Sequence, residues 1–265
     1  MELRPVFEKD RPINLFEDGF MKILLTNDDG YHAHGIMHLK HLLAACGHEV
    51  YTAAPKSQMS GVSGSITLTD SIKVEQVDDR NFIVDGTPID CVKVALDQYL
   101  KTRPDLLISG INIGTNLGSD TLYSGTVAAA IEGSLLGVKS MAISTSWQFD
   151  GSNYDKSFDE YIKNAVEITA SFHMPDFSIL NFNIPLCNVK GIRTAPLGLL
   201  SYVGGYVKDE YENAFRLSGK LDIEKMADQK IDAVYYYNGY MTVTPIQYDM
   251  TNYELLDKIS HLNHP

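Results

Sequence analysis

Hydrophobic residues in this chain fall into short apolar runs separated by stretches with helical spacing. The runs are four to six residues long, typical of buried strands in a parallel sheet, and cover residues 21–26, 50–54, 106–109, 141–145 and 179–184. A helix is predicted over residues 35–46 because its apolar positions recur at i, i+3, i+7 and i+10: Ile36, Leu39, Leu43 and Cys46. Strand–helix–strand order with short connections is typical of βαβ units. The pattern therefore predicts an α/β fold with a mostly parallel sheet.

Three more helices are predicted from residues that commonly open helices. Thr87 is a suitable N-cap and Pro88 a suitable first-turn residue. Ser124-Gly125-Thr126 opens the second of these helices, and Ser157 opens the third. Together with the strands, they give alternating elements from residue 21 to about residue 185.

Two regions depart from this alternation of strands and helices. Residues 56–84 begin with a Ser/Gly-rich loop, Ser57–Ser65, and continue with alternating stretches that indicate a β-hairpin. After about residue 186 the chain is rich in tyrosine and shows few helix signals. We interpret residues 186–250 as β-hairpin extensions and residues 251–262 as a terminal helix. Exposed aromatic residues on such arms are typical of self-association, although they could equally cover the core.

The expected organisation is thus a single domain with two additions. It comprises residues 1–20 as an N-terminal extension outside the core, 21–185 as the catalytic core, and 186–265 as a β-hairpin and C-terminal oligomerisation extension of the same domain.

Length and charge narrow the class of protein. With 265 residues and 44% hydrophobic content, the chain can bury one large core. Its formal net charge of −12 argues against binding a nucleic-acid duplex, which needs a basic surface. Small anionic substrates remain compatible with this charge if a metal supplies positive charge locally. Because no apolar stretch reaches transmembrane length, we expect no membrane partner.

The cysteines indicate a reducing environment. There are three, without CxxC spacing, and an odd number does not suit a disulfide framework. We therefore expect a cytoplasmic protein. Cys46, Cys91 and Cys187 each lie in an apolar context and are interpreted as buried structural thiols.

Adjacent carboxylates follow the first predicted strand. Asn27-Asp28-Asp29-Gly30 stands where that strand ends, the edge of an open α/β sheet at which ligands bind. Asp28 and Asp29 repel each other and are costly to desolvate, so a hard divalent cation with oxygen ligands would stabilise them. The same tetrapeptide is also compatible with ordinary turn chemistry.

Two further polar segments follow other strands. The loop after the third strand, Ser109–Gly118, contains Asn112 and Asn116 among three glycines, which let backbone approach a ligand closely. A flexible surface loop is the alternative interpretation. Ser124-Gly125-Thr126 is the best predicted phosphate site, because a helix N-terminus offers free N–H groups and a favourable dipole. Simple N-capping by Ser124 is the alternative there.

Several common motifs are absent. The sequence contains no GxxxxGK[ST] motif, no GxGxxG motif after the first strand and no GxSxG elbow. The clustered histidines include pairs with a helical spacing that would suit zinc, but no carboxylate completes a zinc pattern. We interpret them as solvent-exposed: His32, His34, His38 and His41.

Taken together, the motifs resemble those of the stationary-phase survival protein SurE family, metal-dependent nucleotidases. The matching stretches span residues 21–250 and are strongest in 23–145: Ile23–Gly30, Ala54-Pro55 with Ser60-Gly61, Gly86–Val92, Pro104-Asp105, Ser109–Gly118, Tyr123–Ala130 with Glu132-Gly133, Asn181–Pro185, Gly239-Tyr240 and Val243–Pro245. The departures are Lys56, His34, the Tyr235–Tyr237 stretch and the leader. They leave every matched ligand in place.

The resemblance implies a Rossmann-like three-layer core with a C-terminal β-hairpin or swapped arm that builds a homodimer or homotetramer. It implies one divalent metal per subunit, held by Asp28, Asp29, Ser60 and Asn112. Asn116, Ser124, Gly125 and Thr126 match phosphate-site positions, and Asp28, Asp29 and Asn116 are the expected catalytic residues. Magnesium or manganese suits this oxygen-rich set better than zinc.

The implied activity is hydrolysis of nucleoside 5′-monophosphates, and in some members of 3′-monophosphates and short polyphosphate. An aspartyl-phosphate phosphatase with Asp28 as nucleophile is one alternative, although the Asp-x-Asp spacing is absent. A nucleotide-binding regulatory protein without turnover is another.

Overall fold

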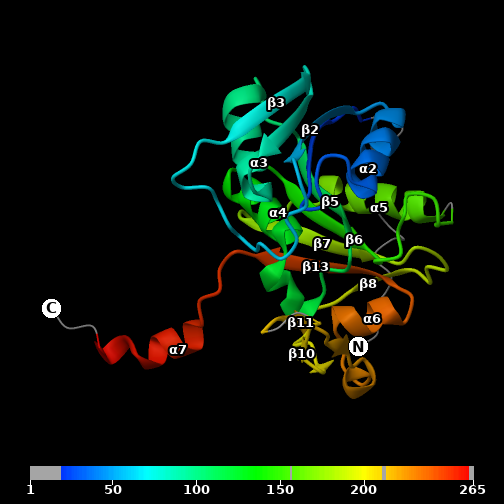
Figure 1. Ribbon diagram of the computed structural model, residues 1–265, viewed down its shortest axis with the longest axis vertical. Helices are drawn as coiled ribbons and strands as arrows, with labels where there is room; N and C mark the ends of the chain where they lie inside the picture. Colours follow the sequence, from blue (N-terminus) through cyan, green and yellow to red (C-terminus); the bar gives the residue numbers. More distant parts are fainter. Residues whose placement is uncertain (1–18, 156, 211–212, 263–265) are drawn as a thin grey trace.

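The computed structural model describes residues 19–155, 157–210 and 213–262. Within these residues, a nine-stranded sheet with the order β3-β4-β2-β1-β5-β6-β7-β13-β8 forms the centre of the molecule (Figure 1). Its strands are β1 (Lys22–Thr26), β2 (Glu49–Pro55), β3 (Lys73–Asp78), β4 (Asn81–Asp85), β5 (Leu106–Ile113), β6 (Ser140–Thr145), β7 (Ser178–Ile184), β8 (Ile192–Thr194) and β13 (Met241–Gln247). β3 pairs antiparallel with β4 and β13 pairs antiparallel with β7, whereas the other neighbours are parallel. The predicted α/β fold is confirmed.

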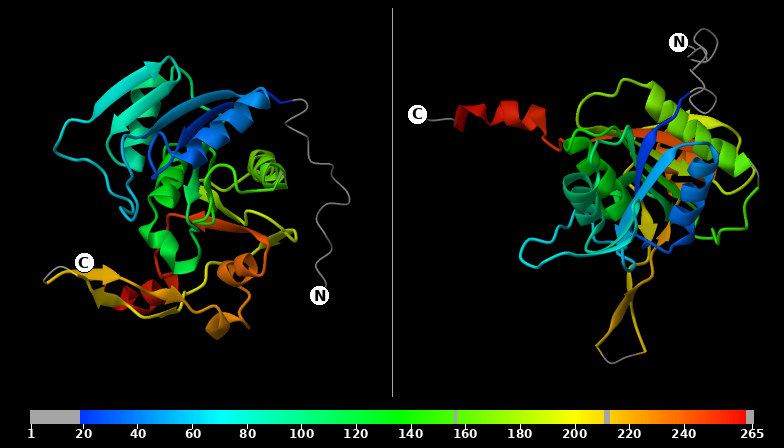
Figure 2. Two further views of the ribbon diagram at one scale, coloured as in Figure 1. Left: turned by 45° about the vertical axis from the view of Figure 1, so that its right-hand side comes forward. Right: turned by 90° about the horizontal axis from the view of Figure 1, so that it is seen from above.

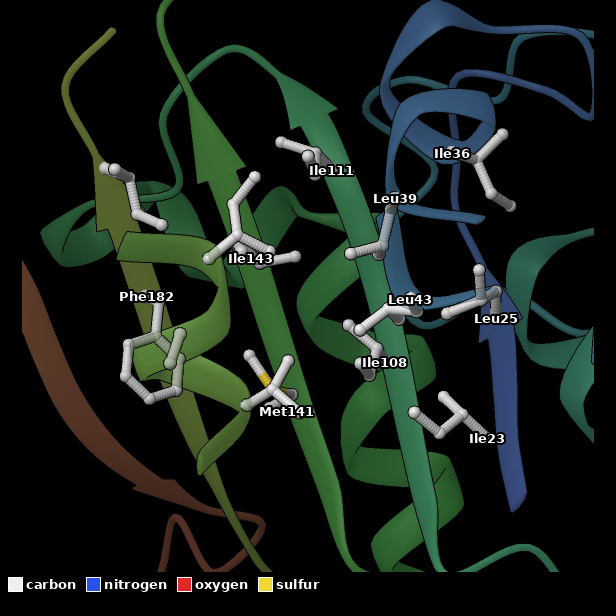
Figure 3. Close-up of a cluster of buried hydrophobic side chains, with 14 of the residues drawn as sticks. Ile23, Leu25, Ile36, Leu39, Leu43, Ile108, Ile111, Met141, Ile143 and Phe182 are labelled. Atoms are coloured by element: carbon white, nitrogen blue, oxygen red, sulfur yellow. The ribbon is translucent and has the colours of Figure 1, made fainter. Parts of the chain in front are cut away.

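One face of the sheet is covered by α2 (His34–Ala45) and α5 (Ser157–Ser171). Alternate strand residues point to this face, so Ile23 and Leu25 of β1 pack here while Leu24 packs on the other side. The helical stripe of α2 buries Ile36, Leu39 and Leu43 completely against these strands (Figure 3). Each such side chain contributes roughly 1.5–3 kcal/mol of burial free energy.

The opposite face is covered by α3 (Pro88–Val94), which continues into a π-helical turn (Ala95–Tyr99), and by α4 (Gly125–Leu135). Thr87 caps α3 as predicted, since its side chain accepts a hydrogen bond from the Asp90 backbone N–H at 3.2 Å. The layers are therefore helix, sheet and helix, as expected for a Rossmann-like core.

The region after residue 185 contains the predicted antiparallel hairpin pairing but differs from its prediction elsewhere. Two of its strands, β8 and β13, complete the central sheet and are not hairpin extensions. The Tyr235–Tyr237 stretch lies in a short helix, α6 (Asp232–Tyr237). Separate two-stranded pairs join β9 (Tyr202–Val203) to β12 (Lys220–Leu221) and β10 (Tyr206–Lys208) to β11 (Phe215–Leu217), and the latter hairpin projects from the body (Figure 2). Short 3-10 turns occupy Gly118–Tyr123 and Glu224–Met226.

The C-terminal segment extends away from the sheet. It contains α7 (Tyr253–Lys258) and a 3-10 turn (Ser260–Leu262), where the sequence predicts one terminal helix (Figure 1). Neither element buries any residue within the described part of the chain.

Cys91 is buried as predicted, but Cys46 is only partly buried and Cys187 is exposed, because Cys187 follows the end of β7. All three are free thiols. The predicted extension, residues 1–20, lies outside the described residues except for Gly19 and Phe20.

Candidate functional site

A tight turn at the carboxyl end of β1 positions the two adjacent carboxylates. Asn27 closes this turn on itself: its Oδ1 accepts from the Gly30 N–H at 3.2 Å and its Nδ2 donates to the Gly30 carbonyl at 2.9 Å. Gly30 has φ of +104°, a conformation that residues with a Cβ rarely adopt. The local sequence therefore determines the turn that carries Asp28 and Asp29.

Asp28 is directed to the N-terminus of α4. It is only 4% exposed, and its Oδ1 accepts a hydrogen bond from the Thr126 hydroxyl at 2.6 Å. Burial raises the pKa of this carboxyl, while the hydrogen bond from Thr126 and backbone groups of Gly125 and Thr126 oppose the increase.

Asp29 is directed to β5. Its Oδ2 accepts from the backbone N–H of Ile113 at 2.9 Å. The pKa of Asp29 is raised to about 6, mainly by burial; the Ile113 hydrogen bond lowers this pKa and the neighbouring charge of Asp28 raises it. The turn thus places a pair of poorly hydrated carboxylates between β5 and α4.

The Ser/Gly-rich loop lies against this pair. The backbone N–H of Met59 donates to the Asp28 carbonyl at 2.7 Å, which fixes the loop one residue before Ser60. Ser60 itself is exposed, and its hydroxyl accepts from the Gln58 amide at 2.9 Å. At its far end the loop contacts the segment before α4, because Ser63 Oγ donates to the Leu122 carbonyl at 2.6 Å.

Strand β5 extends four residues beyond the predicted Ser109 and carries Asn112 within it. Asn112 is 8% exposed, and its Nδ2 donates to the Gly114 carbonyl at 2.6 Å. This bond uses the NH₂ end of the carboxamide, so its carbonyl oxygen is the atom that would serve a cation. The alternative interpretation of this segment as a flexible loop is wrong, because its first residues belong to the central sheet.

Asn116 is held by three buried side chains from neighbouring strands. Its Nδ2 donates to Ser144 Oγ at 2.8 Å, and its backbone N–H donates to Asn183 Oδ1 at 2.8 Å. Its carbonyl accepts from the amides of Asn181 and Asn183 at 2.9 and 3.0 Å. The sequence alone indicates no role for these supporting residues. Their signal is the spacing of Asn181 and Asn183 at i and i+2, which places both on one face of β7.

Asp232 is a further residue that the sequence did not reveal. It is fully buried at the start of α6, and burial raises its pKa. Its Oδ2 accepts from the Gly118 N–H at 2.7 Å, and its Oδ1 accepts from the Gly198 N–H at 3.3 Å. Asp232 thereby ties the segment after Asn116 to the C-terminal part of the chain.

The start of α4 shows the N-capping that was one of the two interpretations of the Ser124-Gly125-Thr126 segment. Ser124 Oγ accepts from the Val127 N–H at 3.0 Å and is therefore an N-cap. The Thr126 hydroxyl is directed to Asp28. The helix N-terminus thus lies directly beside a buried carboxylate, and the positive end of its dipole favours negative charge there.

The interpretation of the histidines as solvent-exposed is wrong for His38. Its Nε2 lies 2.7 Å from Asp159 Oδ1, and its ring packs among Phe149, Tyr154 and Phe158. The reason is that α5 covers the face of α2 that carries His38. His32, His34 and His41 are exposed, as predicted.

The fold and this cluster define a class of protein. It is an α/β protein whose mostly parallel sheet presents carboxylate, carboxamide and hydroxyl groups at the carboxyl edge of its parallel strands, beside a helix N-terminus. This arrangement suits the binding of a hard cation and a phosphate group. In the described residues no three His, Cys, Asp or Glu side chains group as a metal site, so any cation here would use this mixed oxygen set. No helix in the described part of the chain is long and apolar enough to cross a membrane.

Comparison with known proteins identifies the family. The family described as "Survival protein SurE" matches residues 23–203, and the chain belongs to the SurE family. It is 36% identical to the 5′-nucleotidase SurE of Caldanaerobacter subterraneus subsp. tengcongensis over 251 residues, which cover 91% of this chain and 97% of that protein. It is 40% identical to the 5′-nucleotidase SurE of Legionella pneumophila over 248 residues, with 91% and 97% covered.

A solved structure agrees with this assignment. The crystal structure of a SurE protein from Aquifex aeolicus superposes with a TM-score of 0.78 at 34% identity, covering 91% of this chain and 98% of that one. The resemblance inferred from the sequence motifs is therefore confirmed.

Proposed function

We propose that this protein is a metal-dependent phosphatase that hydrolyses nucleoside 5′-monophosphates to nucleoside and phosphate. The names of the similar proteins support the activity, since two of them are called 5′-nucleotidase. The structural observation that carries the proposal is the pair of adjacent carboxylates at the carboxyl edge of the sheet, of which Asp28 is buried and Asp29 is partly buried.

The residues at this edge suit a hard divalent cation. Asp28 and Asp29 take part in none of the ion pairs found among the described residues, although burial makes their charges costly. We assign one divalent cation per subunit to Asp28, Asp29, Ser60 and Asn112, an oxygen set that favours magnesium or manganese. When bound, such a cation supplies Lewis-acid chemistry and lowers the pKa of a water molecule.

The protein's own side chains supply the proton acceptor and the contacts to phosphate. The carboxylates of Asp28 and Asp29 are the proton acceptors available to an attacking water. Asn116 and the N-terminus of α4, with Ser124, Gly125 and Thr126, hold phosphate oxygens and stabilise the negative charge that develops on them. Buried hydrogen bonds already fix the position of Asn116, so this residue needs no further ordering when substrate binds.

The proposal is tested by measuring phosphate release from a panel of nucleoside 5′- and 3′-monophosphates and short polyphosphate. Asp28→Asn is expected to abolish release while the circular-dichroism spectrum stays native. Asp176→Asn is the matched control, because Asp176 is exposed and precedes β7 at the opposite edge of the sheet. Excess chelator is expected to inactivate the enzyme, and magnesium or manganese to restore it.

Each alternative predicts a different result. Near-wild-type turnover of Asp28→Asn, or full activity in chelator, would refute the metal site. Nucleotide binding without phosphate release would favour a regulatory protein, and a trapped phospho-enzyme would favour the aspartyl-phosphate mechanism.

The C-terminal arm supports assembly into a homodimer or homotetramer. Residues 248–262 expose seven large apolar side chains: Tyr248, Met250, Tyr253, Leu255, Leu256, Ile259 and Leu262. A second copy of this chain would bury them. The free thiols are compatible with the expected cytoplasmic location.

A further inference from the structure

The single tryptophan of the chain lies exposed beside the proposed phosphate site. Trp147 follows the carboxyl end of β6, and 72% of its surface is exposed. Its indole occupies the position that a side chain at Gly114 would take: a Cβ built there would fall 2.5 Å from Cζ2 and 2.6 Å from Cε2. The ring therefore packs directly on the backbone of Gly114.

Gly114 belongs to the segment that carries two proposed site residues. It stands two residues after Asn112 and two before Asn116, and its carbonyl accepts the Asn112 side-chain hydrogen bond at 2.6 Å. Its own N–H donates to the Thr145 carbonyl at 3.0 Å. Two residues span at most ~7 Å of chain, so the indole lies within reach of a molecule whose phosphate is held by Asn116.

The loop that carries Trp147 is anchored on both sides. Thr145 closes β6 before it, and Phe149, 3% exposed, packs into the core after it. The backbone N–H of Phe149 also donates to the Ser146 carbonyl at 3.1 Å. An aromatic ring fixed in this way can be stacked upon with little loss of conformational freedom.

We infer that Trp147 is a specificity-determining residue that stacks on the base of the nucleotide substrate. A stacked base adds affinity for every nucleotide without hydrogen-bond recognition, so the site would favour nucleotides over phosphate esters that lack a base. Larger purine rings would gain more than pyrimidines. This inference rests on the proposed nucleotidase function and names the residue that recognises the nucleoside half of the substrate.

The first test compares substrates with and without a base. For adenosine 5′-monophosphate, Trp147→Ala should raise KM roughly 5- to 150-fold, the range that base–aromatic stacking provides. For ribose 5-phosphate its KM should stay unchanged, and Trp147→Phe should retain most of the wild-type value. Phe172→Ala is the control, since Phe172 is an exposed aromatic residue beyond the end of α5. Equal loss with both substrates would overturn the inference.

The second test needs no turnover. Because the chain has one tryptophan, the tryptophan fluorescence of the protein reports on Trp147 alone. Adenosine should quench this emission in a saturable manner, whereas ribose and inorganic phosphate should not. No quenching by adenosine, or emission that acrylamide cannot reach because another copy covers the ring, would refute stacking. If the protein releases phosphate from nucleotides but adenosine does not quench its emission, the proposed function stands and base stacking on Trp147 is refuted. Quenching by adenosine without phosphate release would support base stacking on Trp147 and refute the proposed phosphatase function.

Discussion

Substitution of Gly35 by alanine tests how closely α2 must approach the site strand. Gly35 lies in the first turn of α2, and a Cβ added there would stand 1.9 Å from the Ile111 carbonyl oxygen and 2.9 Å from its carbonyl carbon. Close C···O contacts in proteins are about 3.3 Å or longer, so α2 and β5 would have to separate by about 1.4 Å. The obstacle is backbone, which cannot rotate out of the way as a side chain can.

Two opposing effects set the size of the change. Alanine improves helix propensity by at most about 1 kcal/mol relative to glycine. Overpacking a well-filled interior costs about 1–3 kcal/mol. The overpacking term prevails because the two nearest atoms belong to the Ile111 backbone, and we expect a net loss of about 1–2 kcal/mol in the free energy of unfolding. The melting temperature should then fall by about 2–8 °C.

The same displacement should affect activity. Ile111 directly precedes Asn112, so movement of β5 shifts a proposed metal ligand, and a displacement of about 1 Å can reduce activity by roughly 100-fold. Urea unfolding and kcat/KM for phosphate release measure the two effects. Gly205→Ala is the control, because no heavy atom lies within 4 Å of its added Cβ. A Gly35→Ala protein at least as stable as the wild type would refute the reasoning, since propensity would then outweigh the contact.

Two further predictions concern the site and the arm. Thr126→Val removes the hydroxyl that donates to Asp28 while keeping the side-chain volume; kcat/KM should fall at least about tenfold and stability by about 1.5–3 kcal/mol. Thr126→Ser should restore most of both, and equal behaviour of the two variants would contradict the proposed hydrogen bond. Truncation after Gln247 removes the exposed apolar arm and should convert the proposed homo-oligomer to a smaller species in light scattering. An unchanged mass would show that the arm does not join the copies.

The local pattern of the sequence was sufficient to predict much of the fold. The five predicted core strands and the helices that follow them appear in the structure within a few residues of their expected bounds, because burial on both faces requires continuous apolar runs. Turn chemistry was equally informative: Asn27-Asp28-Asp29-Gly30 forms its turn with hydrogen bonds between residues three apart. Such interactions depend on neighbours in the chain and can therefore be predicted from it.

Other features depend on partners that are distant in sequence. Strand β13 pairs with β7, about sixty residues earlier, and its alternating residues show only that it is a strand. His38 has the spacing of an exposed helix residue, yet Asp159 and three aromatic rings surround it once α5 packs on α2. The environment of each residue follows from the whole fold, so a local pattern could not indicate it.

The proposed site combines the two kinds of information. The chain alone indicates the residue types, carboxylates, amides and hydroxyls after successive strands, and hence the hard-cation and phosphate chemistry that they suit. Folding adds the contacts among them: Asp28 against Thr126, Asp29 against Ile113, and Asn116 against three buried side chains. It also adds the exposed indole on Gly114. The physical reason is that chemical character belongs to each side chain, whereas burial, pKa and contact arise only when strands far apart in sequence become neighbours in the sheet.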